Sequence, residues 1–232
     1  MLHIVAALRL AFVATDTVRG FIGIVILAAL FWLLETIWPE DRRHRKLRKG
    51  YLTDILYFFF LVPIAKSIGT VGIAIAFVLV IHFMPHAIGL AQISSQPLGL
   101  QGLEVLFIGD VIGYWSHRAF HKVPVLWPYH AIHHSSEHLD WLAAARVHPI
   151  DTIVSRLIVT VPFFFIGVSA NVLAPYVLFL ALYPIYLHAN VPWGYGPFRY
   201  LIASPAFHRW HHTAEQALSL IHISEPTRQA EI

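Results

Sequence analysis

This chain is organised around three histidine clusters: HRAFH at residues 117–121, HAIHH at 130–134 and HRWHH at 208–212. Residues three and four apart lie on one face of a helix, so each cluster can direct two or three imidazoles at one point. Neutral imidazole is a good ligand for iron, zinc, copper and nickel. The chain has no cysteine, which excludes thiolate sites of the zinc-finger and iron–sulfur types. The clusters therefore predict a metal centre with imidazole ligands.

The number of clustered histidines indicates more than one metal. The three clusters together hold eight histidines, whereas one transition metal offers roughly four to six coordination positions. We therefore predict two metals. A further candidate ligand is His188, which stands at the end of an apolar segment.

The composition predicts an integral membrane protein with a single domain. Hydrophobic residues make up 57% of the 232 residues and charged residues 12%, against roughly a quarter charged in a soluble domain. The segment EDRRHRKLRKG at 40–50 is dense in lysine and arginine, and such a loop is expected on the cytoplasmic side of the membrane. Because the basic residues gather at this membrane edge, the net charge of +3 does not indicate nucleic-acid binding.

The apolar segments of the first half predict membrane-spanning helices. Residues 1–20 are interpreted either as an interfacial helix or as a partial span. Phe21–Trp38 is a clear first span of about the minimum length for crossing a bilayer. Tyr51–Met84 is mostly apolar but is interrupted at Pro63, so it is either one long kinked crossing or two short helices.

Leu100–Phe120 is predicted to be an apolar helix with one polar stripe. The stripe follows steps of four, three and four residues through Asp110, Tyr114, His117 and His121. Ionisable groups inside a span are costly and usually functional. Asp110 is therefore a candidate for orienting a histidine by accepting its free N–H. The alternative is a buried aspartate that is hydrogen-bonded to a tyrosine or a serine.

Two further apolar segments, Asp151–Val168 and Asn171–Asn190, are separated by a tight break at 167–170. They predict a helical hairpin that leaves and returns to the same face of the membrane, where it delivers His188 and Asn190. The final segment, LSLIHISEPTRQAEI at 218–232, changes character abruptly. We interpret it as the translated read-through of a sequencing-library adapter, expect the natural sequence to stop near Ala217, and leave His222 out of the ligand set.

With these residues in place, the chain resembles the fatty acid hydroxylase/sterol desaturase superfamily of membrane non-haem di-iron enzymes. The resemblance runs from about Leu103 to Thr213. It is carried by HRAFH, by LWPYHAIHHSSEHLDWLAAARVHP at 126–149, by HAN at 188–190 and by SPAFHRWHH at 204–212. It implies a domain over 1–217 with its histidine core at 103–213, four transmembrane helices, and a cytosolic cap that holds two metals. It also implies the use of O₂ and of an external electron donor.

One position departs from the superfamily pattern. A histidine or asparagine often lies four residues before the position of His188, and this chain has Pro184 there. The ligand set would then be completed by His148, Asn190 or water.

The function expected from these observations is that of an O₂-dependent di-iron hydroxylase or desaturase of an apolar C–H bond in a membrane lipid. Its electrons would come from a separate protein, since no flavin, haem or nicotinamide motif is present. The alternative is a membrane metal-binding or metal-transport protein. The predicted metal ligands are His117, His121, His130, His133, His134, His188, His208, His211 and His212. Further candidates for the metals or their surroundings are His138, His148, Asn190 and Asp110, with Asp140, Asp151 and Glu137 as orienting acceptors. The sequence indicates no oligomeric state.

Overall fold

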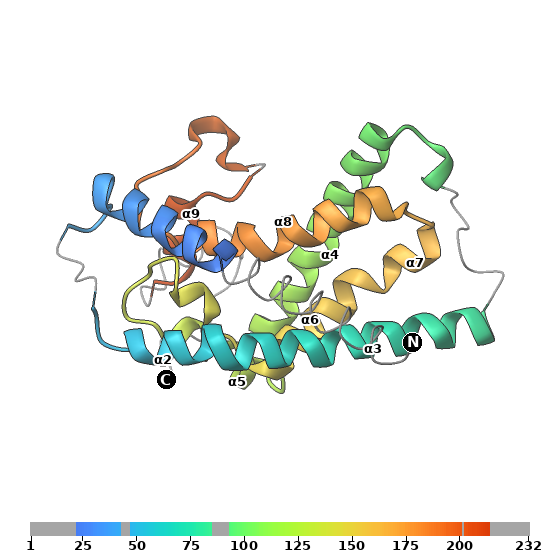
Figure 1. Ribbon diagram of the computed structural model, residues 1–232, viewed down its shortest axis with the longest axis horizontal. Helices are drawn as coiled ribbons and strands as arrows, with labels where there is room; N and C mark the ends of the chain where they lie inside the picture. Colours follow the sequence, from blue (N-terminus) through green and yellow to red (C-terminus); the bar gives the residue numbers. More distant parts are fainter. Residues whose placement is uncertain (1–21, 43–46, 85–92, 201, 214–232) are drawn as a thin grey trace, which may run out of the picture.

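The computed structural model describes residues 22–42, 47–84, 93–200 and 202–213, and all regular structure within them is helical. The interpretations of residues 1–20 and of the 218–232 segment concern residues outside this part of the chain. The elements follow a helix at Ile22–Ile37 in the order α2 (Tyr51–Leu56), η1 (Tyr57–Leu61), α3 (Val62–Phe83), η3 (Ile93–Ser95), α4 (Leu98–Lys122), α5 (Trp127–His130), η4 (His133–Ser135), η5 (Ala143–Ala145), α6 (Pro149–Thr160), α7 (Pro162–Ile166), α8 (Ala170–His188), η6 (Gly196–Tyr200) and α9 (Pro205–His211) (Figure 1).

The segment Tyr51–Phe83 is one continuous helix of 33 residues, long and apolar enough to cross a membrane. This decides between the two sequence alternatives in favour of a single long helix. Pro63 lacks an N–H, and its ring would clash with the carbonyl one turn earlier in a regular α-helix. The wider π-helical turn η1 lies directly before Pro63 and lets the helix continue through it.

The predicted hairpin is confirmed. Its outgoing arm is α6 followed by α7, and its returning arm is α8. Gly167 ends α7 with φ 67° and ψ 46°, a left-handed conformation that glycine adopts without steric cost. The chain therefore reverses at Gly167, and α8 carries His188 back toward the histidine clusters (Figure 1).

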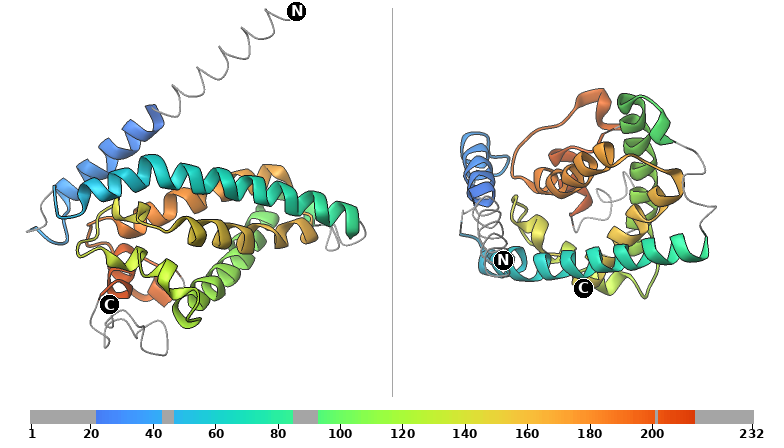
Figure 2. Two further views of the ribbon diagram at one scale, coloured as in Figure 1. Left: turned by 90° about the horizontal axis from the view of Figure 1, so that it is seen from below. Right: turned by 45° about the vertical axis from the view of Figure 1, so that its right-hand side comes forward.

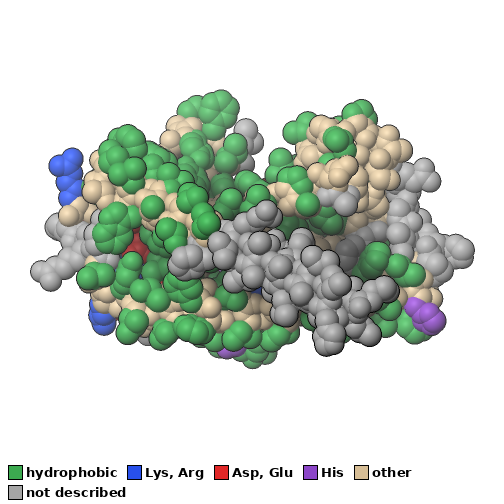
Figure 3. Space-filling model, in the orientation of Figure 1, with side chains coloured by type: hydrophobic (Ala, Val, Ile, Leu, Met, Phe, Trp, Pro, Cys, Tyr) green, Lys and Arg blue, Asp and Glu red, His purple; other side chains and the backbone are tan. Residues whose placement is uncertain are grey.

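Two of the described helices, Tyr51–Phe83 and Asn171–His188, have the length and composition of membrane spans. The sequence-based expectation was four. Helix α4 spans 25 residues, but polar side chains such as Glu104 and Asp110 lower its apolar character. Pro162 separates α6 from α7, so neither of these two segments of the outgoing arm reaches the length of a span. On the face drawn in Figure 3, hydrophobic side chains are nevertheless spread over the described helices, and Lys and Arg side chains are visible at the left-hand edge.

The packing of the helices gathers the histidine-bearing segments at one end of the molecule. Helices α3 and α6 run side by side, and α8 packs against both α4 and α9 (Figures 1 and 2). A core beside the histidine segments consists of Phe31, Trp141, Leu142, Ala189 and Val191. A second core joins α4, α7 and α8 through Val105, Phe163, Val172 and Tyr176.

Gly109 of α4 faces Tyr176 of α8, which gives a test of the helix packing. A methyl group there would overlap the Tyr176 hydroxyl and lie 2.6 Å from its Cζ atom. Gly109→Ala is therefore expected to destabilise the fold by about 1–3 kcal/mol, the usual range for overpacking. The matched control is Gly113→Ala, one turn along α4, where a Cβ atom meets nothing within 4 Å. Thermal unfolding in detergent should separate the two variants, and equal melting temperatures would contradict this packing.

Candidate metal centre

Four short segments bring histidines to the same end of the molecule. The last turns of α4 carry His117 and His121, α8 ends on His188, and the HAIHH segment runs from α5 into η4. The third cluster lies on α9 and directly after it. That helix begins where Ser204 caps it, with its Oγ accepting a hydrogen bond from the Phe207 N–H at 3.3 Å.

The histidines form two separate groups. Five of them, His117, His121, His130, His134 and His211, form one group, and four, His133, His188, His208 and His212, form the other. Within each group one ring nitrogen per residue lies within 4.8 Å of all the others. Together these are the nine histidines that the sequence analysis selected as metal ligands.

The division between the groups follows helical geometry. Histidines four residues apart share a group: 117 with 121, 130 with 134, and 208 with 212. His133 lies in sequence between His130 and His134, and His211 lies between His208 and His212. Each of these two histidines belongs to the other group from the pair that flanks it. The second and third clusters therefore each contribute to both groups, which holds the two groups next to one another.

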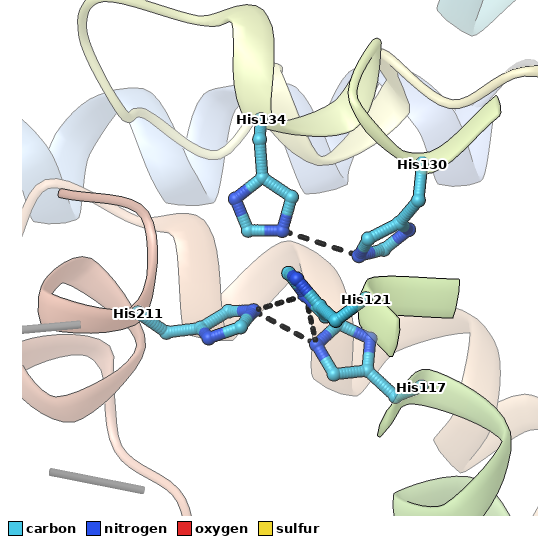
Figure 4. A group of neighbouring side chains, drawn as sticks. All are labelled: His117, His121, His130, His134 and His211. Atoms are coloured by element: carbon cyan, nitrogen blue, oxygen red, sulfur yellow. Dashed lines mark hydrogen bonds between the residues drawn. The ribbon is translucent and has the colours of Figure 1, made fainter. Parts of the chain in front are cut away.

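The five-histidine group has a geometry that hydrogen bonding alone does not satisfy. The Nε2 atoms of His117, His121 and His211 form a triangle with sides of 2.8, 3.1 and 3.2 Å (Figure 4). Each Nε2 carries either one hydrogen or one lone pair. In a triangle at least two neighbours must therefore be alike, which is repulsive. A shared cation removes the conflict, since metal–nitrogen bonds of roughly 2.1 Å at right angles place nitrogens about 3 Å apart.

The four-histidine group shows the same spacing. His188 Nε2 lies 3.1 Å from His133 Nε2 and 3.2 Å from His208 Nε2, and His212 Nε2 lies 3.1 Å from His208 Nε2. The Nε2 atoms again converge on one point. Both groups therefore fit a bound transition metal.

Oxygen atoms behind the rings fix which nitrogen carries the proton. His130 Nδ1 donates to Asp151 Oδ2 at 2.7 Å, and His188 Nδ1 donates to the Pro184 carbonyl at 2.7 Å. His133 Nδ1 donates to the Arg146 carbonyl at 3.3 Å. Carboxylate and carbonyl oxygens only accept, so Nδ1 is protonated and Nε2 keeps its lone pair for a metal. Of the four predicted acidic acceptors, Asp151 is the one for which the structure shows a hydrogen bond to a histidine of the two groups.

Burial keeps the histidines of the second and third clusters neutral. It lowers the pKa of the His133, His134, His208, His211 and His212 side chains well below the ordinary value, and the neighbouring imidazoles lower it further. A neutral imidazole is the form that binds metal. The electrostatic environment therefore favours the ligand form at neutral pH.

The structure places the other candidate residues outside both groups. His148 caps α6, with its Nδ1 accepting the Ile150 N–H at 3.1 Å, and His138 is an exposed residue. Asp110 is exposed on α4, with Tyr176 and Tyr183 as neighbouring ionisable groups. None of the three belongs to either histidine group.

Asn190 also lies outside the groups and connects the histidine region to the first helix. Its Oδ1 accepts the Asp41 N–H at 3.1 Å, and its Nδ2 donates to the Asp41 carbonyl at 3.2 Å. Its own N–H donates to Glu35 Oε1 at 2.9 Å, and the same oxygen accepts the Trp141 N–H at 2.8 Å. Glu35 and Asn190 are thus anchors between distant segments.

A buried ion network supports the four-histidine group, and the sequence analysis did not identify it. Arg48 makes two bonds to Asp140, at 2.7 and 2.8 Å, and one to Asp54 at 2.6 Å. Arg146 donates to the other oxygen of Asp54 at 2.5 Å. Burial opposes the charge on Arg48, but the two carboxylates raise its pKa above the ordinary value. Since the Arg146 carbonyl receives His133 Nδ1, the network holds a predicted ligand in position.

Arg48, in the basic segment 40–50, is thus buried rather than solvated. Glu137, another predicted orienting acceptor, instead makes an exposed ion pair with Lys49 at 2.7 Å. An isolated charge within an apolar run, such as Asp54, is the signal that points to a buried partner.

The fold and the site define an all-helical protein that carries two apolar helices of membrane-spanning length among its described residues and two polyhistidine groups at one end. The chain belongs to the fatty acid hydroxylase family, whose profile matches residues 102–223, more than half of its length.

Comparison with curated proteins gives relatives in the same family. The chain is 28% identical over 195 residues to ornithine lipid hydroxylase OlsE of Rhizobium tropici, an alignment that covers 80% of this chain and 56% of that protein. It is 34% identical over 107 residues to alkylglycerol monooxygenase of Homo sapiens, covering 46% of this chain and 24% of that protein. The chain thus spans about half the length of the first relative and about a quarter of the second. No solved structure matches the chain significantly.

Proposed function

We propose that this chain is an O₂-dependent di-iron oxygenase that hydroxylates an apolar C–H bond of a membrane lipid. The observation that carries the proposal is the pair of adjacent polyhistidine groups at one end of apolar helices. The names of the relatives, a lipid hydroxylase and an alkylglycerol monooxygenase, favour hydroxylation over desaturation. The ligands lie at helix ends and in loops rather than in the middle of spans, which favours an enzyme over a metal transporter.

In this proposal the two groups each hold one iron, and the nine histidines of the two groups are the ligands. Bound iron supplies the electrons and the Lewis acidity that O₂ activation requires. The protein supplies a neutral shell of imidazole nitrogens, in which Asp151 and the carbonyls of Pro184 and Arg146 fix the tautomers. In this proposal electrons reach the site from a separate donor protein, since the sequence has no flavin, haem or nicotinamide motif.

We further propose four membrane-embedded units: three crossings, by the Ile22–Ile37 helix, the Tyr51–Phe83 helix and α4, and the α6–α8 hairpin, which enters and leaves the bilayer on the same side. The histidine groups and the basic loop at 40–50 then share the cytoplasmic side. The lipid would enter from the bilayer, since large hydrophobic side chains are exposed along the Ile22–Ile37 helix, α3, α4 and α8. In this arrangement residues 1–217 form one domain.

The proposal is tested with protein purified from membranes and reconstituted anaerobically with ferrous iron. Two irons per chain are expected, together with O₂ consumption that depends on added lipid and on an electron donor. Mass spectrometry should find lipid products that have gained one oxygen atom. Metal binding without any lipid-dependent O₂ consumption would favour the metal-transport alternative instead.

Asp151 gives a test of how the site is supported. Its Oδ2 accepts from His130 Nδ1, and its Oδ1 accepts from the Ser155 hydroxyl at 3.0 Å. Asp151→Ala should weaken iron binding at the five-histidine group by roughly 10–100-fold, because His130 loses the partner that fixes its tautomer. The measurement is iron retention during dialysis against a chelator. Ser155→Ala is the control, since it leaves the His130 contact in place, and equal losses in both variants would contradict the assigned role.

A further inference from the structure

Lys66 and Arg156 are two cations that lie together where α3 packs against α6. Lys66 and Gly69 are three residues apart on α3 and share one side of the helix. The Arg156 side chain crosses α3 at Gly69, with its Cδ and Nε atoms 3.5 and 3.6 Å from the place of a Gly69 Cβ. The guanidinium thus lies beside Lys66, close enough for the two charges to repel one another.

Among the residues that the structure describes, this cation pair has no anionic partner. Both side chains are half-buried, and neither forms a hydrogen bond or ion pair with another residue in the part of the chain that the structure describes. The buried arginines near the histidine groups are different, since Arg48 and Arg146 are both paired with Asp54. Two like charges held together among apolar helices are costly unless a negative charge joins them. The pair is therefore incomplete as it stands.

The position of the pair along the helices indicates which anion fits. The continuous helix Tyr51–Phe83 has 33 residues, or about 50 Å at 1.5 Å per residue, so it is longer than the roughly 30 Å of a bilayer core. Lys66 stands in the half of this helix nearer Tyr51, and its depth is given by its neighbour Arg156. Arg156 stands five residues after Asp151 on α6, about 7.5 Å along that helix. Asp151 contacts His130, so Arg156 lies within about one and a half helical turns of the histidine groups. In the membrane placement of the proposed function, the long side chains of the pair can therefore reach lipid head groups on that side.

We propose that Lys66 and Arg156 bind the acidic head group of a membrane lipid through its phosphate or carboxylate. The planar guanidinium accommodates two oxygens of such a group, and the ammonium adds a point charge. Gly69 borders the site, since a Cβ atom there would be in van der Waals contact with the Arg156 side chain. The inference rests on the membrane placement given in the proposed function, but it requires neither metal nor turnover.

The test is retention of lipid by the full chain in detergent, measured by native mass spectrometry. Phosphatidylglycerol and phosphatidylcholine are offered at equal concentrations, and the wild-type protein is expected to retain phosphatidylglycerol preferentially. The double variant Lys66→Gln/Arg156→Gln should lose this preference by on the order of tenfold, given about 1 kcal/mol for each basic contact to an acidic lipid. Lys66→Arg/Arg156→Lys keeps both charges and should retain most of the preference, which excludes misfolding as the cause.

Arg42→Gln is the matched control, because it removes one exposed cation from the loop before α2 and leaves the pair intact. It should bind lipid as the wild type does. Equal retention of the two lipids by the wild-type protein, or an unchanged preference in the double glutamine variant, would overturn the proposal. Inorganic phosphate that displaces phosphatidylglycerol at equal concentration would replace the lipid by a soluble anion and overturn the lipid assignment. Any of these results leaves the metal proposal standing, since iron content is measured separately.

Discussion

His211→Ala is expected to remove one of two bound irons and to leave the other. The Nε2 atom of His211 forms a triangle with the Nε2 atoms of His117 and His121. The variant therefore removes two of the three contacts in that triangle. His134→Ala should have the same effect, because it belongs to the same group. His188→Ala should instead empty the four-histidine group. Iron content should fall from two to about one per chain, and lipid hydroxylation should fall by at least about 100-fold.

The control for these variants is His148→Ala, which removes a histidine outside both groups and should leave two irons bound. Iron should be added anaerobically, since zinc binds such sites more tightly than ferrous iron and would mask the difference. Spans that still insert into the membrane show that a variant has folded. Wild-type iron content in either His134→Ala or His211→Ala would refute the ligand assignment.

The convergence of the histidines was predictable from spacing, because residues three and four apart must share a face wherever the backbone is helical. The partition into groups of five and four was not. The backbone changes from α to 3₁₀ between His130 and His133, and this turn, which depends on tertiary packing, directs His133 away from His130 and His134. His188 was recognised by its place at a helix end, and the structure sets its ring against His133 and His208.

The helices were predicted well where apolar runs are long, and the break at Gly167 was predicted from its sequence. The polar contacts between segments were not, because they join residues far apart in the chain. Asp54 meets Arg146 across 92 positions, and Asn190 meets Glu35 across 155. Within a helix, the polar stripe drew attention to Asp110, whereas the carboxylate that contacts a histidine is Asp151 on another helix. Local patterns identify an ionisable group in an apolar run, and only the fold identifies its partner.

Asp54→Ala is expected to be among the most destabilising substitutions outside the histidine groups. Asp54 is fully buried and accepts from both Arg48 and Arg146. Its removal leaves Arg48 with Asp140 as its carboxylate partner and Arg146 with the carbonyls of Ser135 and Gly50. Breaking a buried pair in this way typically costs about 3–5 kcal/mol. The loss should appear as a lower melting temperature in detergent. Iron should also leave the four-histidine group first, because the Arg146 carbonyl holds His133.

The contrasting variant is Glu137→Ala, which removes an ion pair between exposed side chains, Glu137 and Lys49. Solvent screens that pair, so neither the melting temperature nor the iron content should change measurably. A neutral replacement of the whole network, with Arg48, Asp54, Asp140 and Arg146 exchanged for apolar residues of similar size, should recover much of the stability lost in Asp54→Ala. If stability returns but the four-histidine group still loses iron, the network acts on the metal by positioning the Arg146 carbonyl that contacts His133. If Asp54→Ala unfolds no more easily than Glu137→Ala, the buried network does not hold this end of the molecule together.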